Sequence, residues 1–191
     1  AAKALIFILL VASYDLLLGY TGIVSFAHTM FFGIGAYGVA IASIKLGESW
    51  IAVAVGLGAA LMLSALLSLS IGLFSLRVRA IFFAMITLAV ASAFQTLASQ
   101  LSELTGGEDG LTLKNPTWLS PAFEPFETEV FGLLIDGRAL SYWLIYLVVA
   151  VMFLLLLRIV NSPFGRVLQA IRENDFRAEA IGYRTVAYRT L

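Results

Sequence analysis

Five apolar segments, each about as long as a membrane-crossing helix, constrain this chain more than any other feature of its sequence. Such a helix needs about 20 mostly apolar residues. The segments are about Ala1–Gly19, Phe26–Ile44, Trp50–Leu76, Ala80–Leu101 and Leu140–Leu157. In lipid, the backbone hydrogen bonds must close within each span, and the alternating pattern of a β-barrel is absent. The sequence therefore predicts an all-α fold, a polytopic helical membrane protein with about five transmembrane helices.

Composition agrees with a membrane environment and excludes several other classes of protein. Of the 191 residues, 61% are hydrophobic and only 13% are charged, whereas soluble domains carry about 25% charged residues. The 12 basic and 12 acidic residues give no net charge, so no basic surface for nucleic acid is expected. The chain has no cysteine, which excludes disulfides, thiolate chemistry and cysteine-bound metals.

The positions of arginine and the acidic residues predict how the spans are oriented. The C-terminal stretch Arg158–Arg189 and the short turn with Arg77 and Arg79 are rich in arginine, so we expect both in the cytoplasm. The loop at 102–139 is mainly acidic, and we expect it outside. Continuing backward through the spans places the turn near Thr21 inside and the first residue outside.

Neither end of the sequence has the features expected at the start or end of a complete protein. It does not begin with Met, Ala1 already lies in an apolar run, and Leu191 follows no closing signal. We therefore expect residues 1–191 to form a single membrane domain that is a fragment of a longer protein.

A glycine-rich stretch joins the first two spans. Its glycines are Gly19, Gly22, Gly33, Gly35 and Gly38. Two interpretations stay open. The stretch forms a tight turn followed by close helix packing, or the backbone is broken at membrane depth, where it lines a water-filled path. In the second case Ser25, His28 and Thr29 would offer polar groups to a solute or to neighbouring helices.

Two ionisable residues stand in or beside these spans. His28 is the only histidine, and a lone histidine in an apolar setting is more often a hydrogen-bonded structural residue than a ligand. No second histidine or paired acid lies at metal-ligand spacing, so no metal site is expected. Asp15 is the only acid well inside a predicted span. It either faces a cavity or is hydrated near the inner end of its span.

The fourth span carries polar residues that share helix faces. Gln95 and Ser99 are four residues apart, as are Ser92 and Thr96. These side chains either hold helices together or line a path. At the outer end of the span, the stretch Thr105-Gly-Gly-Glu-Asp-Gly110 either ends the helix as a turn or forms an external gate or a docking point for a soluble partner.

A new helix is predicted after the fifth span, where Ser162 is an N-cap and Pro163 the first helical residue. Its apolar residues follow the spacing i, i+3, i+4, i+7 and form one face: Phe164, Val167, Leu168 and Ile171. Asn174 begins a second short helix and Gly182 is its C-terminal stop. We expect 162–183 to be a cytoplasmic amphipathic helix pair. It lies on the membrane interface or docks on a protein, and its mixed charges favour the protein.

No catalytic pattern is present in the sequence. There is no nucleophile elbow, no P-loop, no dinucleotide-binding fingerprint and no histidine paired with an acid. We therefore predict neither an enzyme nor a bound cofactor.

Four blocks of the chain resemble the LivM-type permease family of branched-chain amino acid ABC transporters. They are Gly19–Tyr37, Arg79–Ala89, Gly106–Leu111, and Ser162–Asn174 with Ala178–Tyr183. The blocks occur in the family's order and span nearly the whole chain, which makes the resemblance specific. The chain departs from the family pattern at Phe26-Ala27 and at Asp15. The spacing of Glu179 and Gly182 also differs from the Glu-Ala-Ala…Gly loop of other ABC importers. These differences leave the substrate open.

The resemblance implies a transport subunit of a prokaryotic cytoplasmic membrane. Its partners would be a second permease subunit of the LivH type, two cytoplasmic ATP-binding subunits and an external solute-binding protein. The substrate path would include Gly19, Gly22, Ser25, His28, Gly33, Gly35, Tyr37 and Thr87. The ATPase-coupling residues would be Phe164, Arg166, Arg172, Glu173, Asn174, Glu179 and Gly182. The external gate would be Gly106, Gly107 and Gly110.

Other functions stay open beside an importer of branched-chain or related amino acids. Close relatives in the family move urea, short amides or aromatic acids. A secondary transporter or channel would need charge pairs inside the membrane for ion coupling, and only Asp15 offers such a charge. A membrane-embedded enzyme is disfavoured because no catalytic cluster is present.

Overall fold

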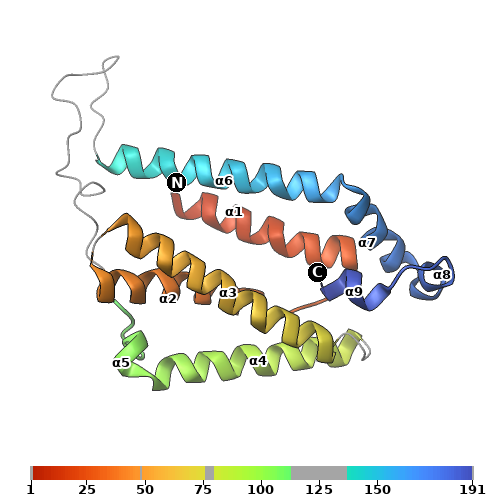
Figure 1. The fold of residues 1–191 in the computed structure, drawn as a ribbon, viewed down its shortest axis with the longest axis horizontal. Coiled ribbons are helices and arrows are strands. Elements are labelled where there is room, and N and C mark those ends of the chain that lie inside the picture. The colour runs from red at the N-terminus through yellow and green to blue at the C-terminus, as the bar shows by residue number, and fades with distance from the viewer. Residues whose placement is uncertain (1, 48, 76–79, 113–136, 191) are drawn as a thin grey trace, which may run out of the picture.

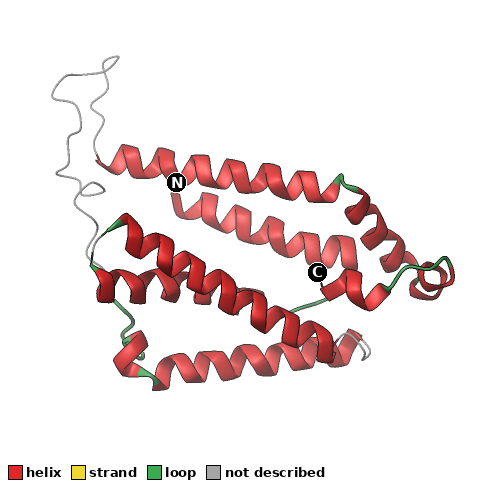
Figure 2. Ribbon diagram, viewed as in Figure 1, coloured by secondary structure: helices red, strands yellow, loops and turns green. Residues whose placement is uncertain are grey.

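We obtained a computed structural model of the chain, which describes residues 2–47, 49–75, 80–112 and 137–190. Within these ranges the regular structure is helical and no strand is present (Figure 2). The elements are α1(Ala2–Asp15), the π-helical turn η1(Leu16–Thr21), α2(His28–Leu46), α3(Trp50–Ser75), α4(Ala80–Gln100), α5(Ser102–Thr105), α6(Gly137–Val160), α7(Pro163–Glu173), α8(Asp175–Ala180) and α9(Thr185–Thr190). The predicted all-α class is confirmed.

Five helical segments are long and apolar enough to cross a membrane. They are Ala2–Thr21, His28–Leu46, Trp50–Leu73, Ile81–Gln100 and Ala139–Val160. The predicted number is confirmed within the described residues, but several boundaries differ by two or three residues. The second span begins at His28 rather than Phe26, because residues 22–27 are not helical. The last span continues past Leu157, and Arg158 stands in its final turn, where a cation is favoured at the helix C-terminus.

The spans carry their large apolar side chains on the outside. Leu61, Trp143 and Leu154 are 69%, 63% and 64% exposed. In water, a surface of this kind would cause aggregation. In lipid it is the expected contact surface, because hydrocarbon tails are as apolar as these side chains.

The helices form two groups (Figure 1). In one group α1 lies beside α6, and in the other α3 lies beside α2 and α4. Residues 22–27 connect the groups. The short C-terminal helices also bridge them at one end, since α7 contacts η1 and α6 while α9 contacts α3.

The tightest contact between spans is the crossing of α2 and α3. A Cβ atom built on Gly56 would lie 2.7 Å from the Gly38 carbonyl oxygen, and one on Gly38 would lie 2.8 Å from the Ala60 Cβ. The core of buried residues continues from this crossing and consists of Ala27, Met30, Ile34 and Ala60. For Gly38, the prediction of close helix packing through glycine is confirmed.

The C-terminal segment forms three short helices where two were predicted. The predicted caps are present: the Ser162 hydroxyl accepts a hydrogen bond from the Gly165 amide, and the Asn174 side chain accepts one from the Arg177 amide. Gly182 ends α8 with a φ of 96°, in the left-handed region. The additional helix is α9, whose Arg189 forms an ion pair of 2.9 Å with Asp175.

Parts of two predicted segments lie outside the described residues. The turn with Arg77 and Arg79 is one of them. Of the predicted loop at 102–139, residues 102–105 form α5, residues 137–139 belong to α6, and residues 113–136 lie outside the described ranges.

The α2–α3 crossing provides a matched pair of variants on one helix. We expect Gly56→Ala to destabilise the protein by about 1–3 kcal/mol, because the new methyl group would overlap the α2 backbone. Gly58→Ala should cause no loss, since a Cβ there meets nothing within 4 Å. Thermal unfolding of the full-length protein in detergent measures both. Equal stability of the two variants would contradict the close crossing.

Candidate functional site

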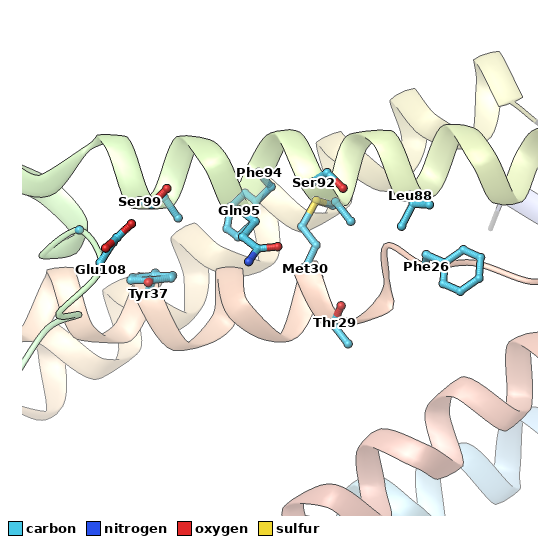
Figure 3. A pocket seen from close by; sticks show the side chains of 13 residues that line it. Phe26, Thr29, Met30, Tyr37, Leu88, Ser92, Phe94, Gln95, Ser99 and Glu108 are labelled. Carbon is cyan, nitrogen blue, oxygen red and sulfur yellow. The ribbon is translucent and has the colours of Figure 1, made fainter.

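The backbone between η1 and α2 leaves the helical conformation over residues 22–27. Gly22 begins the break with a φ of 69°, which glycine adopts without the steric cost that other residues meet. Thr21 and Ser25, on either side of it, are buried. The segment runs along α4 before α2 begins (Figure 3). The structure shows a non-helical segment at residues 22–27, and both its membrane depth and a water-filled path stay predictions.

Thr87 of α4 provides a hydrogen-bond partner for the backbone of the non-helical segment, residues 22–27. Its hydroxyl oxygen accepts a hydrogen bond of 3.2 Å from the Phe26 amide, and the hydroxyl donates one of 2.9 Å to the Ala84 carbonyl. Thr87 is fully buried. An amide without a partner in an apolar setting is costly. The structure thus gives Thr87, a predicted path residue, the role of holding the segment in place.

His28 faces α1 rather than α4. Its Nε2 lies 2.9 Å from the Ser13 hydroxyl oxygen, and its ring meets that of Tyr14 edge to face at 5.5 Å. This contact links the first two spans, which is the structural role left open for a lone histidine. Asp15, also on α1, is exposed.

A cavity of about 690 Å³ lies between α2, α4 and the loop after α5 (Figure 3). The residues that line it are Phe26, Thr29, Met30, Tyr37, Leu88, Ala91, Ser92, Phe94, Gln95, Ala98, Ser99, Gly107 and Glu108. Of the predicted path residues, Tyr37 lines this cavity directly. Gly33 lies behind it, since a Cβ there would be 3.5 Å from the Phe94 ring, and one on Gly35 would meet nothing within 4 Å.

The polar face of α4 turns toward this cavity, with Ser92, Gln95 and Ser99 on its wall. The sequence predicted that these side chains line a path or hold helices together; they line a cavity, and a path stays a prediction. Glu108 was missed as a site residue. The sequence places Glu108 inside the glycine turn. It does not show that this turn lies over α4, which only the fold reveals.

The glycines of the predicted gate form a tight turn. Gly106, Gly107 and Gly110 have φ values of 75°, 64° and 72°, and a Cβ on Gly106 would overlap the Gly110 carbonyl. The Thr105 hydroxyl oxygen accepts a hydrogen bond of 3.3 Å from the Gly107 amide, which fixes the turn to α5. The turn ends α5 and also places Glu108 at the cavity, so the structural interpretation and a gate are compatible.

Arg172 of α7 contacts the membrane spans instead of pointing away from them. Its guanidinium donates to the Gly19 carbonyl, and its methylene groups cover Gly22, where a Cβ would lie 3.0 Å from the Arg172 Cγ. A cation is favoured at a carbonyl near a helix C-terminus. Arg172 therefore links α7 to the start of the broken segment.

Other predicted coupling residues also make contacts within the chain. Phe164 stacks on Tyr188 at 5.8 Å, and Glu179 accepts a hydrogen bond of 2.7 Å from Thr185. Asn174 and Gly182 serve as cap and stop. Arg166 and Glu173 are exposed. Two exposed apolar residues of this region were not among the predicted coupling residues: Phe176 is 86% exposed and Ile181 67%.

Comparison with known proteins identifies the family. The family model described as the permease component of the branched-chain amino acid transport system matches residues 1–191. The chain belongs to this permease family. The resemblance carried by the four sequence blocks is confirmed, and with its spans the chain is a multi-pass membrane protein.

Two curated relatives of this permease chain carry the name "High-affinity branched-chain amino acid transport system permease protein LivM". The proteins from Escherichia coli (strain K12) and Salmonella typhimurium (strain LT2) are each 26% identical to it, over 195 and 198 positions that cover 95% of the chain. The chain spans 45% of the length of each relative. No solved structure matches it.

Loss of the Thr87 hydroxyl should destabilise the broken segment. We expect Thr87→Val to cost about 1–3 kcal/mol, because the Phe26 amide loses its partner in a buried site. Hydrogen exchange of the full-length protein should show faster exchange at residues 22–27. Thr87→Ser keeps the hydroxyl and should preserve the protection. Unchanged protection in Thr87→Val would contradict this role.

The Arg172 contact should hold α7 against the first span. Arg172→Gln is expected to cost about 1 kcal/mol, the usual net contribution of one hydrogen bond, because the site is partly solvated. Faster hydrogen exchange should appear around residues 19–23. Arg166→Gln, an exposed arginine on the same helix, serves as the control and should leave exchange unchanged. Equal behaviour of the two variants would count against the link.

Proposed function

We propose that this chain is part of a permease subunit of an ATP-driven importer that moves branched-chain or related amino acids across the cytoplasmic membrane of a prokaryote. The family match over residues 1–191 is the observation that carries this proposal. The five spans and the partly polar cavity among them agree with a transport role. The subunit itself makes and breaks no covalent bond in the substrate.

The proposed partners are a second permease subunit of the LivH type, two cytoplasmic ATP-binding subunits and an external solute-binding protein. The ATP-binding subunit would meet the outer face of α7 and α8. Phe176 and Ile181 supply exposed apolar contacts there, and Arg166 and Glu173 lie on exposed positions of the neighbouring helix. An apolar residue surrounded by charges is a common form of interface anchor.

The contacts inside the chain suggest how movement of α7 reaches the membrane. Arg172 connects α7 to Gly19 and Gly22, where the backbone leaves the helix. The broken segment is in turn bonded to α4 through Thr87. A shift of α7 would therefore pull on the segment that borders the inner part of the cavity. A non-helical backbone deforms more easily than a helix, since it lacks the ladder of internal hydrogen bonds.

Uptake of amino acids into vesicles tests the function. The complete complex of full-length subunits is reconstituted in liposomes with the solute-binding protein, and uptake of radiolabelled leucine is measured with and without ATP. We expect uptake only when ATP and the ATP-binding subunits are both present. Uptake that persists without those subunits would indicate a secondary transporter or channel, and uptake of urea or aromatic acids in place of leucine would correct the substrate.

The exposed face of α8 should contribute to binding of the ATP-binding subunit. Phe176→Ala is expected to weaken that association by about 2 kcal/mol, as loss of an apolar anchor does. Glu173→Lys should weaken it as well, through the reversed charge. Recovery of the ATP-binding subunit on affinity-purified permease measures the effect.

Phe82→Ala is the matched control for this test, because Phe82 is an exposed phenylalanine on the membrane span α4, far along the chain from α8. It should leave recovery unchanged. Full recovery with both Phe176→Ala and Glu173→Lys would contradict docking at this face.

A further inference from the structure

The cavity beside α4 is polar at one end and apolar at the other. Along α4, Leu88, Ser92, Gln95 and Ser99 face it. Their spacing of four, three and four residues makes them one stripe, about 16 Å long. In Figure 3, Ser99, Tyr37 and Glu108 lie toward one end of the view and Leu88 and Phe26 toward the other.

The polar end is built from hydrogen-bonding groups and one carboxylate. Tyr37 contributes a phenol, Ser99 a hydroxyl and Gln95 an amide. Glu108 is the only charged residue among the described residues that line the cavity, and no cation lines it beside Glu108. The positive-φ turn of Gly106 and Gly107 holds Glu108 in this position. This end can accept a cationic group and can donate hydrogen bonds to an anionic one.

The apolar end is built from hydrocarbon and aromatic surface. Met30 is 4% exposed and belongs to the buried core, while Leu88 comes from α4 and Phe26 from the broken segment. This end offers no charge. Thr29 and Ser92 also line the cavity near these residues, so this end is mainly rather than wholly apolar, and an apolar side chain can lie against Met30, Leu88 and Phe26.

We infer, building on the proposed function, that this cavity is a binding site for one amino acid with an aliphatic side chain. The ammonium group contacts the Glu108 carboxylate, and the substrate carboxylate accepts hydrogen bonds from Tyr37 and Gln95. The aliphatic side chain lies toward Met30, Leu88 and Phe26. A volume of about 690 Å³ falls within the usual range for small-molecule sites, about 300–1,000 Å³. The solute is thus held within the permease itself, apart from the external binding protein.

The orientation has a consequence for transport. With its head group at Glu108, the substrate points its side chain along α4 toward the broken segment. Phe26 lines that end of the cavity, and its amide donates a hydrogen bond to Thr87. The substrate side chain would therefore lie beside residues 22–27, which follow the Arg172 contact at Gly19.

Direct binding tests the site. The detergent-solubilised complex of full-length subunits, without the solute-binding protein, is titrated with radiolabelled leucine in competition with leucinamide and with isocaproate. Leucinamide keeps the ammonium group and should compete, whereas isocaproate lacks it and should not. Glu108→Gln should lower the affinity for leucine about tenfold, as loss of a charged hydrogen-bond partner does.

Two further variants test whether the loss of binding is specific to residues that line the cavity. Glu103→Gln removes a carboxylate from the exposed face of α5, outside the cavity lining, and should leave binding unchanged. Leu88→Ala should weaken binding of leucine about threefold more than binding of alanine, because less apolar surface is covered. Recovery of the ATP-binding subunit with each variant shows that the complex is intact.

The possible outcomes test the binding site and the proposed importer function independently. Equal binding by wild type and Glu108→Gln, or competition by isocaproate as strong as by leucinamide, would overturn the site. If such a complex still takes up leucine with ATP, the proposed function stands. Binding that depends on Glu108 in a complex whose uptake needs no ATP would support the site and overturn the importer.

Discussion

The hydrogen bond from the Phe26 amide to the Thr87 hydroxyl allows the chain to leave the helix among apolar spans. Six residues, 22–27, run outside the regular helices, and each of their amides must find a partner or water. Gly22 supplies the left-handed turn that starts the break, and the fully buried Thr87 supplies a polar group where it passes α4.

The break is also the point where the C-terminal helix α7 meets the spans. Arg172 reaches the Gly19 carbonyl, and its stem covers Gly22, so the glycine serves both the backbone turn and the close approach of α7. Other contacts, such as the stack of Phe164 on Tyr188 and the ion pair of Asp175 with Arg189, join α7, α8 and α9 into one unit. Phe176 is not covered by this unit, and its side chain is 86% exposed. A force applied to this face would therefore reach the broken segment through a short series of contacts.

Sequence reasoning predicted some features of the candidate site correctly and missed others. The four-residue spacing of Gln95 and Ser99 correctly predicted a shared polar face, because helix geometry alone decides which residues align. The family resemblance, in contrast, grouped His28 with Tyr37 in one path. Nine residues apart on α2, they point to different neighbours, His28 to Ser13 of α1 and Tyr37 to the cavity beside α4. The sequence does not say which helix packs on which face. For the same reason the sequence placed Glu108 in a turn or external gate and did not show that it lines the cavity.

The sequence by itself determined the fold class, the number of spans and the starts of α7 and α8. These depend on local physics: the length of apolar runs, and caps such as Ser162 and Asn174 that satisfy the amides of their own helix. The four sequence blocks also determined the family. Tertiary structure alone decided the partners of Thr87, Arg172 and Glu108, because those contacts join residues far apart in the chain. In lipid, apolar surface does not choose among helix faces, so close packing at Gly38 and Gly56 and a few polar contacts make that choice.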